Sequence, residues 1–201
     1  MKRWILTGGI ACGKSMVLNS LHQQKGIRTF SSDLAVHELL DEDRVRTAIL
    51  DRFGAEVFGL DGKVDRRKLG KQVFGENEAR LWLENLIHPL VFDRLESDAA
   101  AAESMAEVHL FVAEIPLHYE VKSPVGADRV VAVLCSPERQ LQRLMSHRGL
   151  TRDKSESILR VQMPILEKAT HADVVIWNDG SPEAVQRQVE LLIAQIAHDG
   201  N

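Results

Sequence analysis

Eight consecutive residues near the N-terminus, Gly8 to Ser15, have the types and spacing of a phosphate-binding loop. They read Gly-Gly-Ile-Ala-Cys-Gly-Lys-Ser and match the pattern Gly-x-x-x-x-Gly-Lys-Ser. Gly8 and Gly13 permit the tight turn in which successive backbone N–H groups point at anionic oxygens. Lys14 can reach the β- and γ-phosphates of a nucleotide, and the Ser15 hydroxyl is a ligand for Mg²⁺. The sequence therefore predicts nucleotide binding.

The segments on either side of this loop supply the setting that the motif requires. Residues 4–7 are a short apolar run of strand type, and residues 16–21 read as a helix. A helix that begins at the end of the loop presents its N–H groups and the positive end of its dipole to the phosphates. We expect nucleotide contacts along the whole segment, from Gly8, Gly9, Ile10, Ala11, Cys12, Gly13, Lys14, Ser15 and Met16.

The composition is that of an ordinary globular protein with one domain, residues 1–201. Hydrophobic residues make up 44% of the chain and charged residues 27%, and the formal net charge is −4. This charge gives no support for general binding to nucleic acid or to anionic membranes. The absence of a long apolar run or a signal-peptide pattern predicts a cytoplasmic protein, and nothing indicates an obligate protein partner. Cys12 and Cys135 lack metal-ligand spacing and are expected to be free thiols.

Five apolar segments read as buried strands, and helical stretches separate them. The segments are residues 4–7, 27–30, 108–115, 129–135 and 174–177. This alternation predicts an α/β fold with a five-stranded parallel sheet that helices cover on both faces. Two Ser-Pro-Glu sequences, at residues 136–138 and 181–183, mark helix starts.

Two further helical segments extend beyond the simple alternation. Residues 31–107 are too many for one crossover helix, and helical patterns at 43–53, 66–74 and 78–102 with a turn at Asp61-Gly62 predict an insertion at residues 42–104. A second ligand is expected beneath it.

Residues 146–170 are rich in Arg and Lys, and Met163-Pro164 must kink or stop a helix there. This segment is expected to be a lid, with a surface helical hairpin as the alternative.

A phosphate loop alone is shared by GTPases, ATPases, transporters and small-molecule kinases. The chain has no Asn-Lys-x-Asp guanine motif, and none of its predicted strands ends in an Asp-x-x-Gly switch. The early loop, the helical insertion and the basic late segment together favour a small kinase that closes over two ligands.

Motifs along nearly the whole chain resemble those of the dephospho-CoA kinase family. They occupy residues 6–10, 53–54, 61–69, 73–74, 87–90, 115–117 with Glu120, Gln140 with Arg143, Gln162, and 172–176 with 178–180. The resemblance implies a doubly wound P-loop kinase fold with a CoA-binding helical insertion and a lid. It also implies transfer of the ATP γ-phosphate to the ribose 3′-hydroxyl of dephospho-CoA, the last step of coenzyme A biosynthesis, with Mg²⁺ as the cofactor.

The resemblance assigns catalytic roles to Lys14, Asp33 and Arg143. The family has a carboxylate at the position of Asp33 that orients or deprotonates the 3′-hydroxyl, a role that suits a proton acceptor. The alternative for Asp33 is a helix N-cap. Arg143 matches a family arginine, whose guanidinium would stabilise charge on the transferring phosphoryl group.

Further contacts to both substrates are implied by the same match. Arg148 lies one place after the family's second lid arginine, which aligns with His147, and Asn178 ends the last strand, where the backbone lines an adenine pocket. The ATP contacts are thus extended by Arg143, Arg148 and Asn178, and dephospho-CoA contacts are expected from Asp33, Arg66, His88, Pro89, Pro116 and Leu117. The alternative for Arg148 is a solvated charge, and that for His88 is a buried histidine. The alternative for Asn178 is a simple turn.

Three positions depart from the family pattern. Ser31 replaces the first acid of an Asp-x-Asp pair, His37 replaces an arginine, and His147 replaces another. These departures leave open a catalytically weak nucleotide- or CoA-binding protein. A P-loop kinase of another small alcohol, such as a nucleoside, is the second alternative.

Overall fold

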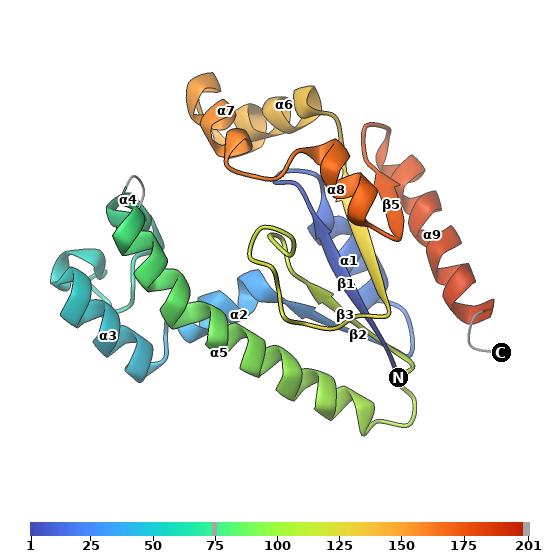
Figure 1. Cartoon of the computed structure of the whole chain (residues 1–201), viewed down its shortest axis with the longest axis horizontal. Helices are drawn as coiled ribbons and strands as arrows, with labels where there is room; N and C mark the ends of the chain where they lie inside the picture. The colour runs from blue at the N-terminus through green and yellow to red at the C-terminus, as the bar shows by residue number, and fades with distance from the viewer. Residues whose placement is uncertain (74–75, 199–201) are drawn as a thin grey trace. The chain divides into compact units, whose positions relative to one another are not determined.

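The computed structural model describes residues 1–73 and 76–198 (Figure 1). Its sheet contains the strands β1 (Lys2–Gly8), β2 (Ile27–Ser31), β3 (Leu110–Glu114), β4 (Arg129–Leu134) and β5 (Val174–Trp177), in the order β2-β3-β1-β4-β5. β1 pairs in parallel with β3 and with β4, and β4 pairs in parallel with β5. The predicted α/β fold with a five-stranded parallel sheet is confirmed.

The helices follow the predicted alternation with the strands. They are α1 (Lys14–His22), α2 (Ser32–Leu39), α3 (Asp43–Phe53), the 3₁₀ turn η1 (Ala55–Val57), α4 (Arg66–Val73), α5 (Asn77–Glu103), α6 (Pro137–Arg148), α7 (Arg152–Arg160), α8 (Ile165–His171) and α9 (Pro182–His198). The predicted helix at 43–53 has the bounds of α3. The predicted helix at 66–74 ends on Phe74, which lies outside the described residues, as does that part of the family motif at 73–74.

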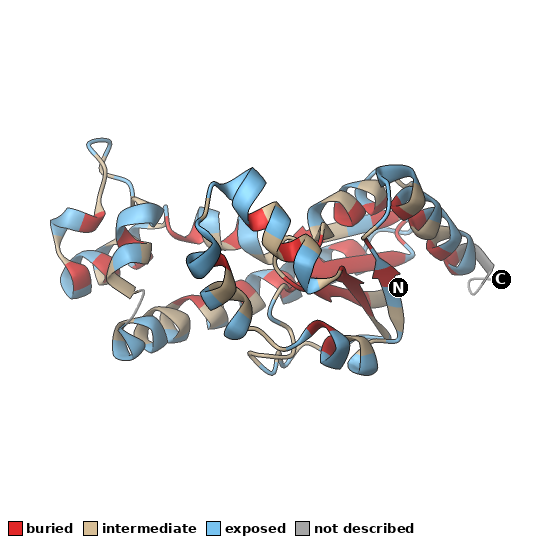
Figure 2. Cartoon of the chain, turned by 90° about the horizontal axis from the view of Figure 1, so that it is seen from above, coloured by how far each residue is buried: buried red, intermediate tan, exposed pale blue. Residues whose placement is uncertain are grey.

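Both faces of the central strand are buried, which explains the continuous apolar run at the N-terminus. Trp4 and Leu6 belong to the core cluster that α1 and α9 help to form, whereas Ile5, only 1% exposed, is not part of that cluster. Since successive side chains of a strand point to opposite faces, Ile5 is buried on the other side of the sheet. Figure 2 shows the buried residues concentrated in these strands.

Local sequence signals set the helix ends near the sheet. Ser136 caps α6, since its hydroxyl accepts a hydrogen bond from the Arg139 N–H at 3.3 Å, and Pro137 fills the first helical position. Thr151 caps α7 in the same way. α7 ends before Met163-Pro164 and α8 begins directly after it, so the predicted helix break is confirmed.

The chain forms two compact units. One comprises Met1–Phe30 and the chain from Ala99 onward, and the other comprises Ser31–Asp98. The second unit has its own apolar core, which includes Val45, Ile49 and Phe53. Phe53 meets Trp82 edge to face, with ring centroids 5.4 Å apart. The boundaries expected for a CoA-binding insertion and for a lid stay predictions.

The helical unit contains one predicted turn and one proline within a helix. The turn at Asp61-Gly62 is confirmed: Gly62 has a φ of +73°, and Phe58 and Val64 form an antiparallel bridge on either side of the turn. α5 continues through Pro89, so this proline does not end the helix.

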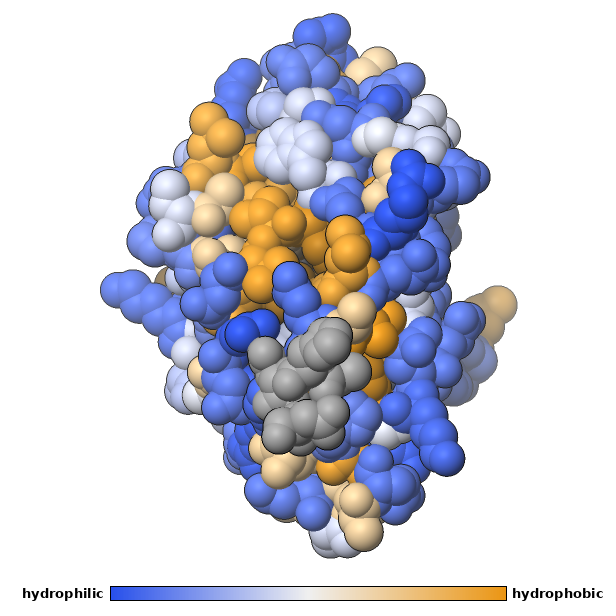
Figure 3. Space-filling view, turned by 90° about the vertical axis from the view of Figure 1, so that its right-hand side faces the viewer, coloured by the Kyte–Doolittle hydropathy of each residue, from blue (hydrophilic) through white to orange (hydrophobic). Residues whose placement is uncertain are grey.

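The sheet edge at β5 carries exposed apolar side chains. Val175 and Trp177 are each 38% exposed, and Leu191 on α9 is 66% exposed. Figure 3 shows apolar side chains gathered among polar ones on the side where Figure 1 draws these two elements. The strand has four residues, too few to offer a long template for pairing with another chain.

Within residues 1–73 and 76–198, no helix is both long and apolar enough to cross a membrane.

Candidate active site

The phosphate loop joins β1 to α1 at the carboxyl end of the central strand. The neighbours of β1 are β3 and β4, so the loop lies where the strand order of the sheet reverses, the place at which open α/β sheets bind ligands. Gly8 and Gly13 have φ values of +143° and +94°. A Cβ atom on Gly8 would strike the Val133 carbonyl, and one on Gly13 would strike the Asn178 amide. Both glycines are therefore required by space as well as by backbone angle.

Three consecutive carbonyl oxygens of the loop are turned toward the protein. Each accepts a hydrogen bond from a side chain far along the sequence: Gln140 Nε2 to Ile10 O at 2.7 Å, Arg143 Nη1 to Ala11 O at 3.1 Å, and Asn178 Nδ2 to Cys12 O at 2.7 Å. Gln140 and Asn178 are buried. Because these carbonyls are bound on the outside, the loop can present its N–H groups to an anion on the inside.

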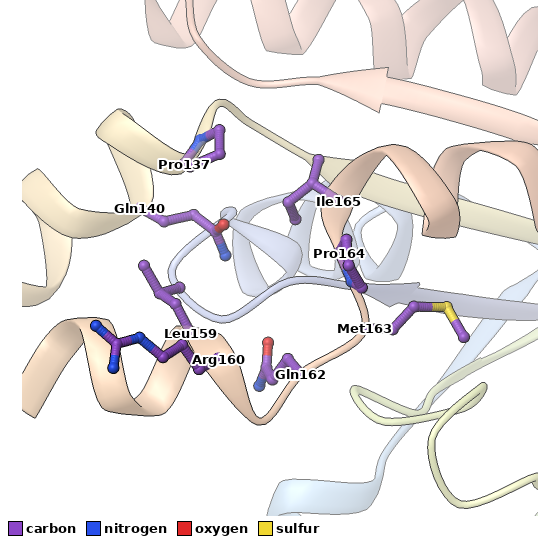
Figure 4. A pocket seen from close by; sticks show the side chains of 8 residues that line it. All are labelled: Pro137, Gln140, Leu159, Arg160, Gln162, Met163, Pro164 and Ile165. Carbon is purple, nitrogen blue, oxygen red and sulfur yellow. The ribbon is translucent and has the colours of Figure 1, made fainter.

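Ile10 is held on both sides of its backbone. In addition to the bond from Gln140, the Ile10 N–H donates to Gln162 Oε1 at 3.0 Å. Figure 4 shows the side chains of Gln140 and Gln162 directed at the loop ribbon from opposite sides. They line a cleft of about 270 Å³ to which α6, α7 and α8 contribute. This part of the loop is fixed by two glutamines from two different elements.

The charged side chain of the loop rests on the loop itself. Lys14 Nζ donates to the carbonyl oxygens of Gly8 at 3.2 Å and Gly9 at 3.0 Å. When a nucleotide binds, the ammonium group can exchange these carbonyls for phosphate oxygens, which are stronger acceptors. Ser15, the second residue of α1, is exposed, so its hydroxyl is accessible to a metal ion. Met16 packs against the core cluster.

Cys12 anchors the loop in the core. Its sulfur lies 3.4 Å from the sulfur of Cys135 at the end of β4, and both residues are buried free thiols, as predicted. The hydrogen bond from Cys135 lowers the pKa of Cys12, while burial opposes this and the charges of Lys14 and Arg143 add to it. The same hydrogen bond and then burial raise the pKa of Cys135. The contact fixes the inner side of the loop against the sheet.

The two predicted arginines lie in different settings. Arg143 Nη2 donates to Asn178 O at 3.0 Å and to Asn178 Oδ1 at 3.1 Å, in addition to its bond to Ala11. Its guanidinium therefore joins α6, the loop and the segment after β5. Arg148 is the last residue of α6 and is exposed, as is His147.

A turn after β5 holds Asn178 in place. Asp179 accepts hydrogen bonds from the Ser136 N–H at 2.9 Å, the Ser136 hydroxyl at 3.1 Å and the Trp177 indole at 3.0 Å. Burial by itself raises the pKa of Asp179, but these donors outweigh it and keep the pKa below its usual value. The ionised carboxylate thus ties β5 to the start of α6.

The residues expected on the acceptor side lie mostly in the helical unit. Asp33 is exposed in the first turn of α2, whose N-cap is Ser31, so the alternative that Asp33 caps this helix is wrong. A carboxylate in a first turn is favoured by the helix dipole. Arg66 is exposed at the start of α4, and the half-buried His88 on α5 has its ring 6.3 Å from that of Phe92. Pro89 is exposed.

Pro116 and Leu117 belong to the segment between β3 and β4. The Pro116 carbonyl accepts a hydrogen bond from the Thr7 hydroxyl at 3.3 Å, which ties this segment to the residue just before the phosphate loop. Leu117 is 37% exposed. Contact of either residue with a substrate stays a prediction.

Sequence reasoning gave no role to four residues that the structure links to the loop: Gln140, Gln162, Glu120 and Lys168. One signal was available. Lys168 lies three residues after Ile165 and therefore on the apolar face of α8, where a charge is unusual.

A magnesium ion fits the donor set of the loop. Among the described residues, no group of three His, Cys, Asp or Glu side chains is placed to hold a metal. Mg²⁺ is typically held by few protein ligands together with substrate phosphates. The exposed Ser15 hydroxyl beside a cradle of N–H groups matches that mode.

Comparisons with known proteins agree with this geometry. The model of the dephospho-CoA kinase family matches residues 4–183. A dephospho-CoA kinase of Thermosynechococcus vestitus is 35% identical over 196 residues, which cover 97% of this chain and 95% of the relative. One of Carboxydothermus hydrogenoformans is 37% identical over 185 residues, 92% of this chain and 89% of the relative.

Solved structures show the same similarity. A Thermus thermophilus protein aligns with a TM-score of 0.79 at 28% identity and covers 96% of this chain and 97% of its own. A dephospho-CoA kinase of Campylobacter jejuni aligns with a TM-score of 0.66 at 27% identity, with 97% of each chain covered. A shikimate kinase of Acinetobacter baumannii, at 17% identity and a TM-score of 0.54, covers 99% of this chain and 94% of its own and shares the fold.

Proposed function

We propose that this chain, which belongs to the dephospho-CoA kinase family, transfers the γ-phosphate of ATP to the ribose 3′-hydroxyl of dephospho-CoA. The products are coenzyme A and ADP. The observation that carries the proposal is the family match over residues 4–183, which includes a phosphate loop of complete sequence and suitable geometry.

The loop and the start of α1 bind the triphosphate in this proposal. Its N–H groups and the helix N-terminus receive the phosphate oxygens, and Lys14 turns from the carbonyls of Gly8 and Gly9 to the β- and γ-phosphates. Ser15 would hold Mg²⁺ together with the nucleotide. The ion, when bound, neutralises charge on the phosphates. Catalysis rests largely on positioning and charge neutralisation.

Asp33 is the proposed proton acceptor for the 3′-hydroxyl. A carboxylate without a capping role is available for this task, and Asp33 is exposed in the first turn of α2. Arg66, His88, Pro89, Pro116 and Leu117 remain the proposed contacts of the dephospho-CoA.

Arg143 has a positioning role in our proposal, because its guanidinium holds the loop and Asn178 together. In this role Arg143 stabilises the negative charge of the phosphates without touching them, from the side of the loop where its guanidinium binds the Ala11 carbonyl. Asn178, whose amide also binds the loop, would border the adenine, and the exposed Arg148 would contact the phosphates from the end of α6.

A panel of acceptor alcohols tests the function. ADP release is measured with ATP and Mg²⁺ in the presence of dephospho-CoA, nucleosides, shikimate and water alone, and the phosphorylated product is identified by mass. We expect dephospho-CoA to give by far the highest kcat/KM. A nucleoside that matches or exceeds it would contradict the proposal.

Lys14→Ala supplies the matched control for the panel. It should abolish ADP release with every acceptor, because the positive charge that Lys14 brings to the β- and γ-phosphates is lost. The fold should persist. ADP release that survives in this variant would come from a contaminating kinase. If nucleotide and coenzyme A bind but no acceptor is phosphorylated, the protein is a binding protein and the proposal fails.

A further inference from the structure

Lys168 is a buried charged residue that has no role in the proposed phosphoryl transfer. Its side chain on α8 is 0% exposed, and Nζ lies 2.7 Å from Oε1 of Glu120, whose side chain is 17% exposed. Apart from this ion pair, Nζ has no partner within the described part of the chain, and the other Glu120 oxygen, Oε2, has no hydrogen-bond partner there. Moving an ammonium group out of water costs several kcal/mol, and a pair with unsatisfied atoms recovers little of it as stability. A role other than stabilising the core is therefore expected.

The Glu120 carboxylate also holds the junction between two helices. Oε1, the atom nearest to Lys168, accepts a hydrogen bond from the Met163 N–H at 3.0 Å. Met163 lies between α7 and α8 and is followed by Pro164, which has no N–H to donate. The Met163 N–H is thus the last backbone donor before α8, and Glu120 anchors it to the segment between β3 and β4.

The residue before this anchor reaches the phosphate loop. Gln162 Oε1 accepts from the Ile10 N–H at 3.0 Å, opposite the bond from Gln140 to the Ile10 carbonyl. Figure 4 shows Gln162 and Met163 as neighbours beside the loop. A displacement of Met163 would therefore carry Gln162 away from Ile10 and free one side of the loop.

We propose that Glu120 and Lys168 are positioning residues for the nucleotide. The charge of Lys168 fixes the direction of the Glu120 carboxylate, Oε1 of Glu120 fixes Met163, and Gln162 then holds Ile10 in the geometry that binds phosphate. Lys168 has no exposed surface, so it acts only through Glu120. Any effect of these residues on turnover rests on the proposed function. Their effect on ATP binding requires only that the phosphate loop binds the nucleotide.

His118 lies beside this pair and does not replace Lys168 as its cation. Burial is the main cause that lowers the pKa of His118; the charge of Lys168 acts in the same direction, and Glu120 opposes both. The imidazole is therefore neutral at neutral pH. Lys168 supplies the positive charge that orients Glu120.

Two double variants separate positioning from charge burial. Both replace Lys168→Met, and they differ at residue 120, with Glu120→Gln in one and Glu120→Met in the other. Both remove the two charges and keep side chains of similar size, but only Glu120→Gln retains a carbonyl oxygen that can accept from Met163. ATP affinity is measured by direct titration without any acceptor alcohol, alongside the melting temperature and the KM for ATP.

The proposal expects the two doubles to melt alike and to differ in ATP affinity. The double with Glu120→Met should bind ATP about tenfold more weakly, the value of roughly one hydrogen bond. The double with Glu120→Gln should lie between it and the wild type, because its carbonyl oxygen can still accept from Met163 but no charge fixes its direction. Wild-type affinity in the double with Glu120→Met overturns the proposal. Equal losses in both doubles overturn it too, since the Met163 contact would then be irrelevant.

Gln162→Leu gives a test that does not depend on the folding of either double. The single variant should weaken ATP binding about tenfold with an unchanged melting temperature. In its background the difference between the two doubles should vanish, because groups that act through one contact are not additive. Normal ATP binding by Gln162→Leu overturns the proposal. A failure of dephospho-CoA as acceptor would leave these titrations unaffected and would count only against the proposed function.

Discussion

The phosphate loop and the helical unit of Ser31–Asp98 hold their predicted site residues in different ways. In the loop, three consecutive carbonyl oxygens accept bonds from side chains on later elements, two of them buried. In the helical unit, Asp33 and Arg66 are exposed at the starts of short helices. Changes at the buried donors Gln140 and Asn178 should therefore alter stability and nucleotide binding together, whereas changes at Asp33 should alter chemistry alone.

Among the variants that compare the two regions, Asp33→Asn is expected to have the largest effect, on kcat. The change keeps the size of the side chain and removes the proton acceptor. We expect kcat to fall about 10²–10⁴-fold, the usual contribution of a general base. The KM for ATP and the melting temperature should hardly change. Asp51→Asn, also exposed on a helix of the same unit, is the control. A loss of stability that parallels the loss of activity would break the contrast between the two regions.

Asn178→Ala tests the other side of the contrast. The change leaves the Cys12 carbonyl without its donor and removes an acceptor of Arg143. Unsatisfied buried groups cost about 1–3 kcal/mol, so the free energy of unfolding should fall by that amount and the KM for ATP should rise. Asn19→Ala, at an exposed position of α1, should change neither quantity. Weaker ATP binding at full stability would show that Asn178 acts on the nucleotide alone.

A pH titration extends the comparison to the half-buried imidazole of His118. Because burial lowers the pKa of His118, the unfolded chain binds more protons than the native protein just below pH 6.5, the ordinary histidine value. Stability should therefore fall as the pH falls through this window. His118→Leu should remove that loss, with a slope difference below about 1.4 kcal/mol per pH unit, the limit for one proton. Urea unfolding at pH 5 to 8 measures it, and parallel curves would contradict it.

The smallest effect is expected from an ion pair that has the same length as the buried one. Lys63 Nζ lies 2.7 Å from Asp41 Oδ2, as Lys168 does from Glu120, but Lys63 is 61% exposed. The hydrogen bond from Lys63 is the main cause that lowers the pKa of Asp41. Water screens such a pair, so Asp41→Asn should leave the melting temperature unchanged. A clear decrease would mean that exposure is a poor guide to the cost of losing a charge in this protein.

Local patterns predicted the framework of the molecule well. Short apolar runs identified all five strands of the sheet, and the predicted strand at 174–177 has the bounds of β5. The two Ser-Pro-Glu sequences marked the starts of α6 and α9. The phosphate loop could be identified because its chemistry depends on neighbouring residues. No change in composition marks Ser31, where the helical unit begins, because contacts and not residue types define that boundary.

The surroundings of the loop were beyond sequence reasoning for a physical reason. The family motifs include Gln140 and Gln162 without giving them a contact; Gln140 lies on α6 and Gln162 between α7 and α8, and only the folded chain brings both to Ile10. Arg143 was predicted from the family resemblance, yet its hydrogen bonds to carbonyl oxygens give it a positioning role in our proposal. One-dimensional patterns carry no information on such pairings between distant elements.

The distances along the sequence within the loop also set an order of events in folding. The bond between Asn178 and Cys12 spans 166 residues, and that between Gln162 and Ile10 spans 152. The loop leaves the ribosome before these supports, because both follow it by more than 150 residues. Contacts of such long range form slowly and late. A nascent chain, or one truncated before these supports, would thus carry the whole motif without its nucleotide-binding shape, so ATP affinity itself reports that the segments up to Asn178 have been made and folded.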